Sequence, residues 1–363
     1  MRPMQMPLFT GSWLRRVRDA ALALAAVAGA CSVGVAQTTA SPAPGLSSGA
    51  VEAAQPDRGI NEWLLRMHEA SRRRAYIGTF VVSSGSSMAS AKIWHICDGQ
   101  NQMERVESLS GTPRSTFRRD DQVITFLPES KHAVAERRES LGLFPNLLQS
   151  ADSSIAQFYS ARQAGHDRVA GFDADVVVLQ PKDKLRYGYR VWSERRTGLV
   201  VKLQTLDVDG RVLEQSAFSE LQLDAPVNMT KLNQMMSNTG GYKVDRPAEL
   251  IKTTAAAEGW VLKAPVAGFK AMSCFKRPVA ATETAAADNT MQWIFSDGLA
   301  SVSLFVELFD RRQHGQEGLM AIGATQTITR RIGDWWLTVV GEAPAQTLAG
   351  FAQGLERKKS SLN

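Results

Sequence analysis

The sequence predicts an α+β protein built from two domains. From Tyr76 to Phe218, stretches in which apolar and polar residues alternate are separated by turn residues at intervals of about 8–12 residues, which is typical of an antiparallel sheet of hairpins. Before them, Trp63, Leu64 and Met67 have the spacing of one face of a helix. The strand pattern stops over residues 224–250 and resumes afterwards, which indicates a second, smaller unit.

Length and composition agree with this division. A chain of 363 residues is long enough for two domains. Its 44% apolar and 21% charged residues are ordinary for a folded protein and exclude general disorder. The net charge of +6 comes partly from the arginines near the N-terminus, so it is not the footprint of a nucleic-acid-binding protein.

The N-terminus has the order of a secretory signal peptide. Arg15, Arg16 and Arg18 precede the apolar run Ala20–Ala30, which is shorter than the roughly 20 residues that a membrane span needs. Small residues at Gly34–Ala36 predict cleavage after residue 36 and export to the periplasm. Lipidation of Cys31 is the alternative that the sequence leaves open.

The mature chain is expected to contain four segments. Residues 37–58 are rich in Pro, Ser, Ala and Gly and predict a disordered tether. The first domain is expected over residues 59–223, a linker over 224–250 and the second domain over 251–355. In the second domain the pattern predicts strands at Met291–Asp297, Ala300–Phe309, Met320–Thr329 and Trp335–Gly341, and a helix at Pro344–Leu355.

Motifs for catalysis are absent from the sequence. It has no nucleophile elbow, phosphate-binding loop or dinucleotide fingerprint, and its five histidines have no metal-ligand spacing. We therefore expect a binding protein with no metal and no cofactor rather than an exported hydrolase. Cys97 and Cys274 lie in different predicted domains, as two buried thiols or as a bridge between the domains.

Several stretches in both halves resemble the RseB/MucB family. In the first half they are Tyr76–Val81, Asp98-Gly99 with Glu104-Arg105, Leu185–Trp192 and Leu213–Gln215; in the second half they are Phe295–Ser303, Thr329–Trp336 and Val339–Glu342. Their order and spacing hold over roughly residues 60–355, which is nearly the whole mature chain.

The resemblance implies a fold and a function that composition and spacing do not. The first domain would be similar to the lipoprotein carriers LolA and LppX, a half-open antiparallel barrel with helices, followed by a smaller antiparallel sheet with a helix. The protein would bind the periplasmic region of an RseA/MucA-like anti-sigma factor, shield it from the site-1 protease DegS/AlgW, and be released by lipopolysaccharide or related lipids. A periplasmic lipid or lipoprotein carrier is the alternative, and homo-oligomerisation is left open.

Candidate site residues follow from the strand alternation read through this resemblance. For an acyl chain we expect inward-facing side chains at Tyr76, Phe80, Val82, Thr125, Tyr187 and Tyr189. For lipid phosphates or acidic groups of the partner we expect Arg105, Arg190, Arg330 and Arg331, because a guanidinium group binds phosphates and carboxylates through paired hydrogen bonds.

Overall fold

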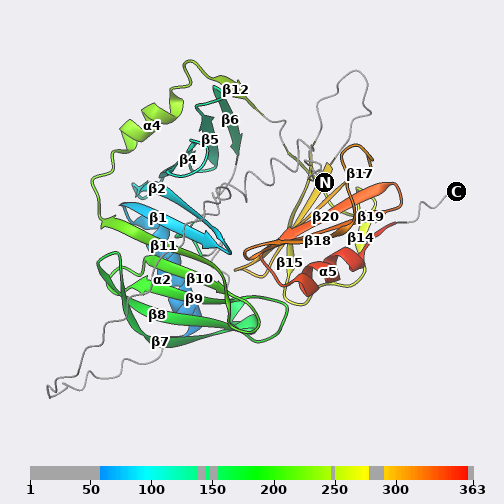
Figure 1. The fold of residues 1–363 in the computed structure, drawn as a ribbon, viewed down its shortest axis with the longest axis horizontal. Coiled ribbons are helices and arrows are strands. Elements are labelled where there is room, and N and C mark those ends of the chain that lie inside the picture. The colour runs from blue at the N-terminus through cyan, green and yellow to red at the C-terminus, as the bar shows by residue number, and fades with distance from the viewer. Residues whose placement is uncertain (1–57, 138–143, 148–153, 247–249, 278–289, 359–363) are drawn as a thin grey trace, which may run out of the picture.

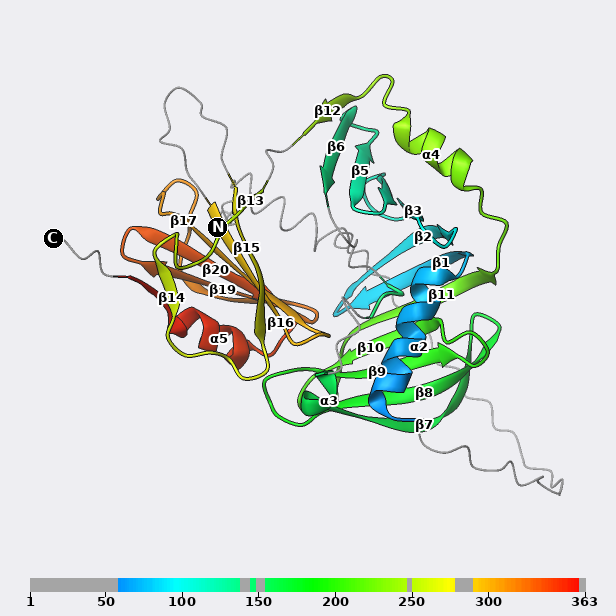
Figure 2. The same ribbon diagram turned by 180° about the vertical axis from the view of Figure 1, so that it is seen from behind.

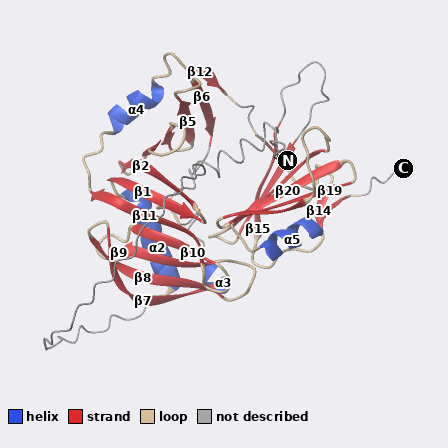
Figure 3. Cartoon of the chain, viewed as in Figure 1, coloured by secondary structure: helices blue, strands red, loops and turns tan. Residues whose placement is uncertain are grey.

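The computed structural model describes residues 58–137, 144–147, 154–246, 250–277 and 290–358. The predicted signal peptide and Cys31 lie outside these residues, as do all but the last residue of the predicted tether. Most of the described chain is strand (Figure 3). No helix among the described residues is long and apolar enough to cross a membrane.

The first sheet has twelve strands in the order β12-β6-β5-β4-β3-β2-β1-β11-β10-β9-β8-β7 (Figure 1). Its strands are β1 (Tyr76–Ser84), β2 (Ser87–Cys97), β3 (Gln102–Ser108), β4 (Ser115–Arg119), β5 (Gln122–Leu127), β6 (His132–Arg137), β7 (Tyr159–Val169), β8 (Phe172–Pro181), β9 (Gly188–Glu194), β10 (Val200–Leu206), β11 (Val212–Leu223) and β12 (Lys243–Asp245). All neighbours are antiparallel except β12 and β6. The sheet bends along its length but stays open, because β12 and β7 remain as edges.

Helix α2 (Ile60–Arg73) lies across the β8–β11 part of this sheet (Figure 2). It forms because one face is apolar, and Trp63, Leu64 and Met67 on that face are buried. The short helix α3 (Ile155–Phe158) precedes β7.

Helix α4 (Met229–Ser237) and strand β12 occupy the segment for which the sequence led us to expect a linker. Asn228 caps α4 by accepting a hydrogen bond from the backbone N–H of Lys231. Leu232 is buried against the first sheet, and β12 pairs with β6. This stretch is therefore part of the first domain. The sequence did not reveal α4 because the helical spacing of its apolar residues is too short to stand out.

The second sheet has seven strands in the order β13-β15-β16-β17-β20-β19-β18. Its strands are β13 (Ile251–Lys252), β15 (Lys270–Arg277), β16 (Thr290–Ser296), β17 (Ser301–Leu308), β18 (Gly318–Ile322), β19 (Thr325–Ile332) and β20 (Trp335–Gly341); β14 (Trp260–Leu262) and β21 (Leu355–Arg357) form a separate pair. Helix α5 (Ala345–Gly354) covers one face with Leu348 and Phe351. An α+β protein with a large and a smaller sheet is thus confirmed.

One strand prediction in the second domain was wrong. The stretch Met320–Thr329, predicted as a single strand, is a hairpin of β18 and β19 that turns at Gly323 and Ala324. Gly323 has φ +58, in the left-handed region that favours glycine, and this allows the tight turn. Leu319–Ala324 is an unbroken run of apolar and small residues, so no polar residue marks the turn in the sequence.

Candidate ligand and partner sites

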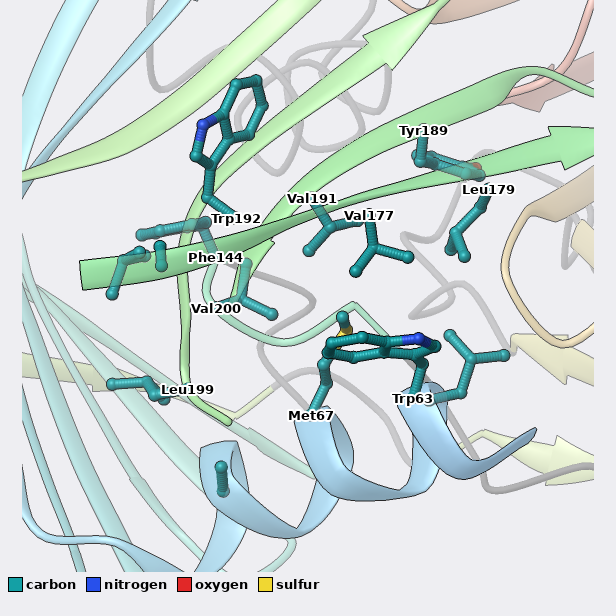
Figure 4. Packing of buried hydrophobic residues seen from close by; sticks show 14 of the residues in the cluster. Trp63, Met67, Phe144, Val177, Leu179, Tyr189, Val191, Trp192, Leu199 and Val200 are labelled. Carbon is teal, nitrogen blue, oxygen red and sulfur yellow. The ribbon is translucent and has the colours of Figure 1, made fainter. Parts of the chain in front are cut away.

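Four of the six residues expected to line an acyl site meet beneath α2. Tyr76, Phe80 and Tyr189 belong to one buried cluster, and Val82 packs against it. In Figure 4, Trp63 and Met67 of α2 point toward Val177, Val191 and Tyr189 of the sheet, so large side chains fill the space between helix and sheet. An acyl chain that entered here would have to displace side chains of α2.

The other two expected residues lie elsewhere. Thr125 is on β5, where its hydroxyl is 3.1 Å from that of Thr116 on β4. Tyr187 is buried at the junction of the domains, where its hydroxyl accepts a hydrogen bond from Gln326 Nε2 at 3.2 Å. The six residues therefore do not form one surface in this arrangement of the chain.

A polar row crosses four neighbouring strands beside the cluster under α2. Tyr76, His95, Glu104 and Arg118 are successive cross-strand partners. All four are buried, and Arg118 Nε lies 2.9 Å from Glu104 Oε2. His95 Nδ1 donates to the carbonyl oxygen of Arg74, the C-cap residue of α2, at 2.7 Å. Burial lowers the pKa of His95 and raises that of Tyr76 well above its usual value, so both side chains are neutral near pH 7.

A second apolar cluster lies on the opposite face of the same sheet. Met103, Phe117 and Phe126 alternate with residues of the first face, and α4 covers them with Leu232. Its partly buried members include three methionines of α4, namely Met229, Met235 and Met236. The thioether side chain adapts to irregular surfaces, so this cluster is a second apolar region that the sequence did not reveal.

The four arginines expected at a partner site are spread over three surfaces. Arg105 lies on the α4 face of the sheet, with its guanidinium group 4.6 Å from the Trp94 ring and bonded to Glu107 at 2.7 Å. Arg190 is on the face of β9 opposite the buried Tyr189 and Val191. In the second domain, Arg330 donates to the carbonyl oxygen of Ala352, and Arg331 stacks 4.1 Å above the ring of Phe309.

The joint between the two domains centres on a buried arginine that the sequence did not single out as a site. Arg186 is fully buried, and its Nε lies 2.8 Å from Oδ2 of Asp297 in the second domain. Its other nitrogens bond Asp183 and the carbonyl oxygen of Ala267. The rings of Phe158 and Phe269 lie 4.6 Å and 5.3 Å from the guanidinium carbon. Arg186 thus satisfies its charge with groups from both domains.

Asp297 and Leu299 form the second domain's side of the joint. Asp297 Oδ1 accepts the backbone N–H groups of Leu299 and Ala300, which fixes the turn between β16 and β17. This turn places Leu299 in the buried cluster beneath α2, so the second domain contributes a side chain to the core of the first. The only sequence signal was that both Arg186 and Asp297 lie in stretches resembling the family.

A carboxyl group lies at a second contact between the domains. Glu214 on β11 accepts a hydrogen bond from the backbone N–H of Ala324, at the turn between β18 and β19, and its Oε2 lies beside Gly323. Burial, with the nearby charge of Glu342, raises the pKa of Glu214 to about 7. This contact therefore titrates close to neutral pH.

Neither metal nor disulfide chemistry is indicated among the described residues. No group of three His, Cys, Asp or Glu side chains in the described ranges could hold a metal ion. Cys97 on β2 and Cys274 on β15 are both free thiols, the first half-buried and the second buried. Burial raises the pKa of Cys274 to about 11, so this thiol is unreactive at neutral pH.

Comparisons with known proteins cover both domains. Residues 59–236 match the family model of the MucB/RseB N-terminal domain, and residues 254–356 match that of the MucB/RseB C-terminal domain. The sigma factor AlgU regulatory protein MucB of Pseudomonas aeruginosa is 29% identical over 294 residues, covering 79% of this chain and 87% of the relative. The sigma-E factor regulatory protein RseB of Escherichia coli is 22% identical over 294 residues, covering 81% and 89%.

Two solved structures of MucB are similar to this chain over most of its length. The crystal structure of MucB in complex with MucA(peri) is similar with a TM-score of 0.62 and 26% identity, covering 82% of this chain and 98% of that chain. The complex structure of Pseudomonas aeruginosa MucA/MucB is similar with a TM-score of 0.64 and 25% identity, covering 83% and 99%.

Proposed function

Because this chain belongs to the MucB/RseB family, we propose that it is a negative regulator of an envelope-stress sigma factor and binds the periplasmic region of an RseA/MucA-like anti-sigma factor. The observation that carries the proposal is the likeness across both domains to MucB solved in complex with MucA(peri). Binding would shield the anti-sigma factor from its site-1 protease and keep the sigma factor inactive.

The mode of action that we propose is binding without catalysis, in the periplasm. The described residues hold apolar clusters on both faces of the first sheet, which suit binding. The predicted signal peptide supports export, and N-terminal sequencing of the protein from the envelope tests it. A mature chain that begins near residue 37 supports the proposal, whereas one that keeps Met1 contradicts it.

Lipid is proposed as the signal that releases the partner. If an acyl chain and the partner favour different states of the protein, each must weaken the binding of the other. The cluster under α2 supports this idea, because an acyl chain there would move α2, and Leu299 connects the same cluster to the second domain. A titration of lipopolysaccharide against the bound partner tests the coupling. If the affinity of the protein for the partner does not change, the protein shields the anti-sigma factor without sensing lipid.

The alternative is a periplasmic lipid or lipoprotein carrier. The one observation that favours a carrier is the apolar cluster under α2, since a carrier needs only a site for acyl chains. A carrier has no use for a second domain joined through a fully buried ion pair. The regulator therefore accounts for more of the described structure.

A further inference from the structure

The outer edges of the two large sheets differ in how they are protected. An exposed edge strand offers unpaired N–H and C=O groups to any passing chain, and proteins guard such edges with short strands, charges or bulges. Here β12 and β13 are only three and two residues long. Strand β7 is long, but it carries a bulge between Gln163 and His166 and exposed charges such as Arg162 and Arg168.

Strand β18 has none of these protections. It pairs with β19 on one side and forms the edge of the second sheet on the other. All five of its residues are exposed, with Leu319 at 58%, Met320 at 50% and Ile322 at 39%. Its sequence, Gly-Leu-Met-Ala-Ile, contains no charged residue. An edge of this composition is a ready template for another strand.

We propose that β18 is the docking edge for an extended segment of a partner protein, which adds to the second sheet as a further strand. Main-chain hydrogen bonds along the edge would supply affinity, and side-chain contacts would supply selectivity. Met320 and Ile322 point to one face of the sheet and Leu319 to the other, so apolar side chains of the partner on either face find a neighbour.

The charges at one end of β18 define the partner further. Beyond Ile322, Glu214 lies beside Gly323, and Glu342 is close enough to influence its ionisation. At and above the pKa of Glu214, about 7, the two carboxyl groups at this end attract a basic side chain. The occupant is therefore an extended segment with apolar side chains and a basic residue at the end that lies next to Gly323.

This inference rests on the proposed function and specifies where the partner binds. The probe is the periplasmic region of an RseA/MucA-like anti-sigma factor, titrated against the full mature protein. Met320→Lys places a charge on the edge, as natural edges do, and should weaken binding by about tenfold or more. Met272→Lys is the matched control, because Met272 is 59% exposed on β15 of the same sheet, away from β18.

Hydrogen exchange provides a second measurement. If the proposal holds, the probe slows exchange of the β18 amides, Met320→Lys weakens binding, and Met272→Lys binds like the wild type. Unchanged binding by Met320→Lys with unchanged β18 exchange would overturn the docking edge and leave the proposed function standing. If sedimentation shows that Met320→Lys abolishes self-association instead, the edge pairs with a second copy and the proposal is wrong. A wild type that does not bind the probe contradicts both the proposed function and the occupant named here.

Discussion

Arg186 Nε and Asp297 Oδ2 lie 2.8 Å apart across the two domains, and neither side chain is exposed to solvent. Removing Asp297 leaves the buried Arg186 with Asp183 as its carboxylate partner, and removing Arg186 leaves the carboxylate of Asp297 buried without its cation. The two domains are therefore held in their relative placement only while both charged side chains are present.

Asp297→Asn should loosen the joint between the domains. The amide oxygen can still accept the backbone N–H groups of Leu299 and Ala300, so the turn is kept while the charge opposite Arg186 is lost. Asp183 still pairs with Arg186, so we expect a loss of about 2–3 kcal/mol in stability, seen as earlier cleavage between the domains in limited proteolysis and a lower melting temperature.

Asp224→Asn is the control for that change. Asp224 pairs with Arg74 at the surface, with side-chain exposures of 66% and 40%, so its loss should cost no more than about 1 kcal/mol. Equal effects of the two substitutions would show that the buried pair does not hold the domains together.

The contact of Glu214 with the second domain should make stability depend on pH. Its pKa is raised from 4.5 to about 7 in the folded protein, so the folded state binds the proton more tightly than the unfolded state. Its contribution is full below pH 4.5 and is lost as the pH rises through about 7. Glu214→Gln keeps an acceptor for the Ala324 N–H but cannot ionise.

The difference between wild type and Glu214→Gln isolates this group from other titrating residues, such as His95. Above pH 7 the variant should be the more stable protein, by at most about 3 kcal/mol, and at about pH 4 the two should melt alike. Thermal unfolding at several pH values measures the difference. A constant difference at all pH values would contradict the assignment.

Acyl-chain binding beneath α2 should depend on Trp63. The indole is 1% exposed and packs against the sheet (Figure 4), so Trp63→Ala should cost about 3–5 kcal/mol in stability. The same change should strengthen binding of a fluorescent acyl probe, because the chain no longer has to displace the indole. Leu65→Ala, at a residue of the same helix that is 48% exposed, should change neither quantity. Weaker probe binding by a folded Trp63→Ala would place the acyl site elsewhere.

The fold class and most hairpins could be predicted because they depend on local patterns. The periodicity around Trp63 and Met67 predicted α2, and the predicted helix at Pro344–Leu355 is α5 at Ala345–Gly354. Strand β7 was missed because its exposed polar residues show little alternation. The hairpin of β18 and β19 was missed because its turn lies in the apolar run Leu319–Ala324, where no polar residue marks it.

The candidate sites were harder to predict, since they depend on contacts between distant residues. Strand alternation identified Tyr76, Phe80 and Tyr189 as buried neighbours, but it does not reveal whether a buried face is filled or hollow. Arg186 finds Asp297 only after the chain has passed through 111 further residues, and nothing local distinguishes it from a surface arginine. Whether such a residue is buried and paired depends on its tertiary contacts, which the spacing of residues in the sequence does not reveal.

The central claim is that this protein binds the periplasmic region of its anti-sigma factor. The most direct measurement is a calorimetric titration of that region into the purified mature protein at neutral pH. The account predicts saturable binding that becomes weaker when lipopolysaccharide is added. A folded protein, with its cooperative melting transition intact, that releases no heat and forms no complex would contradict it.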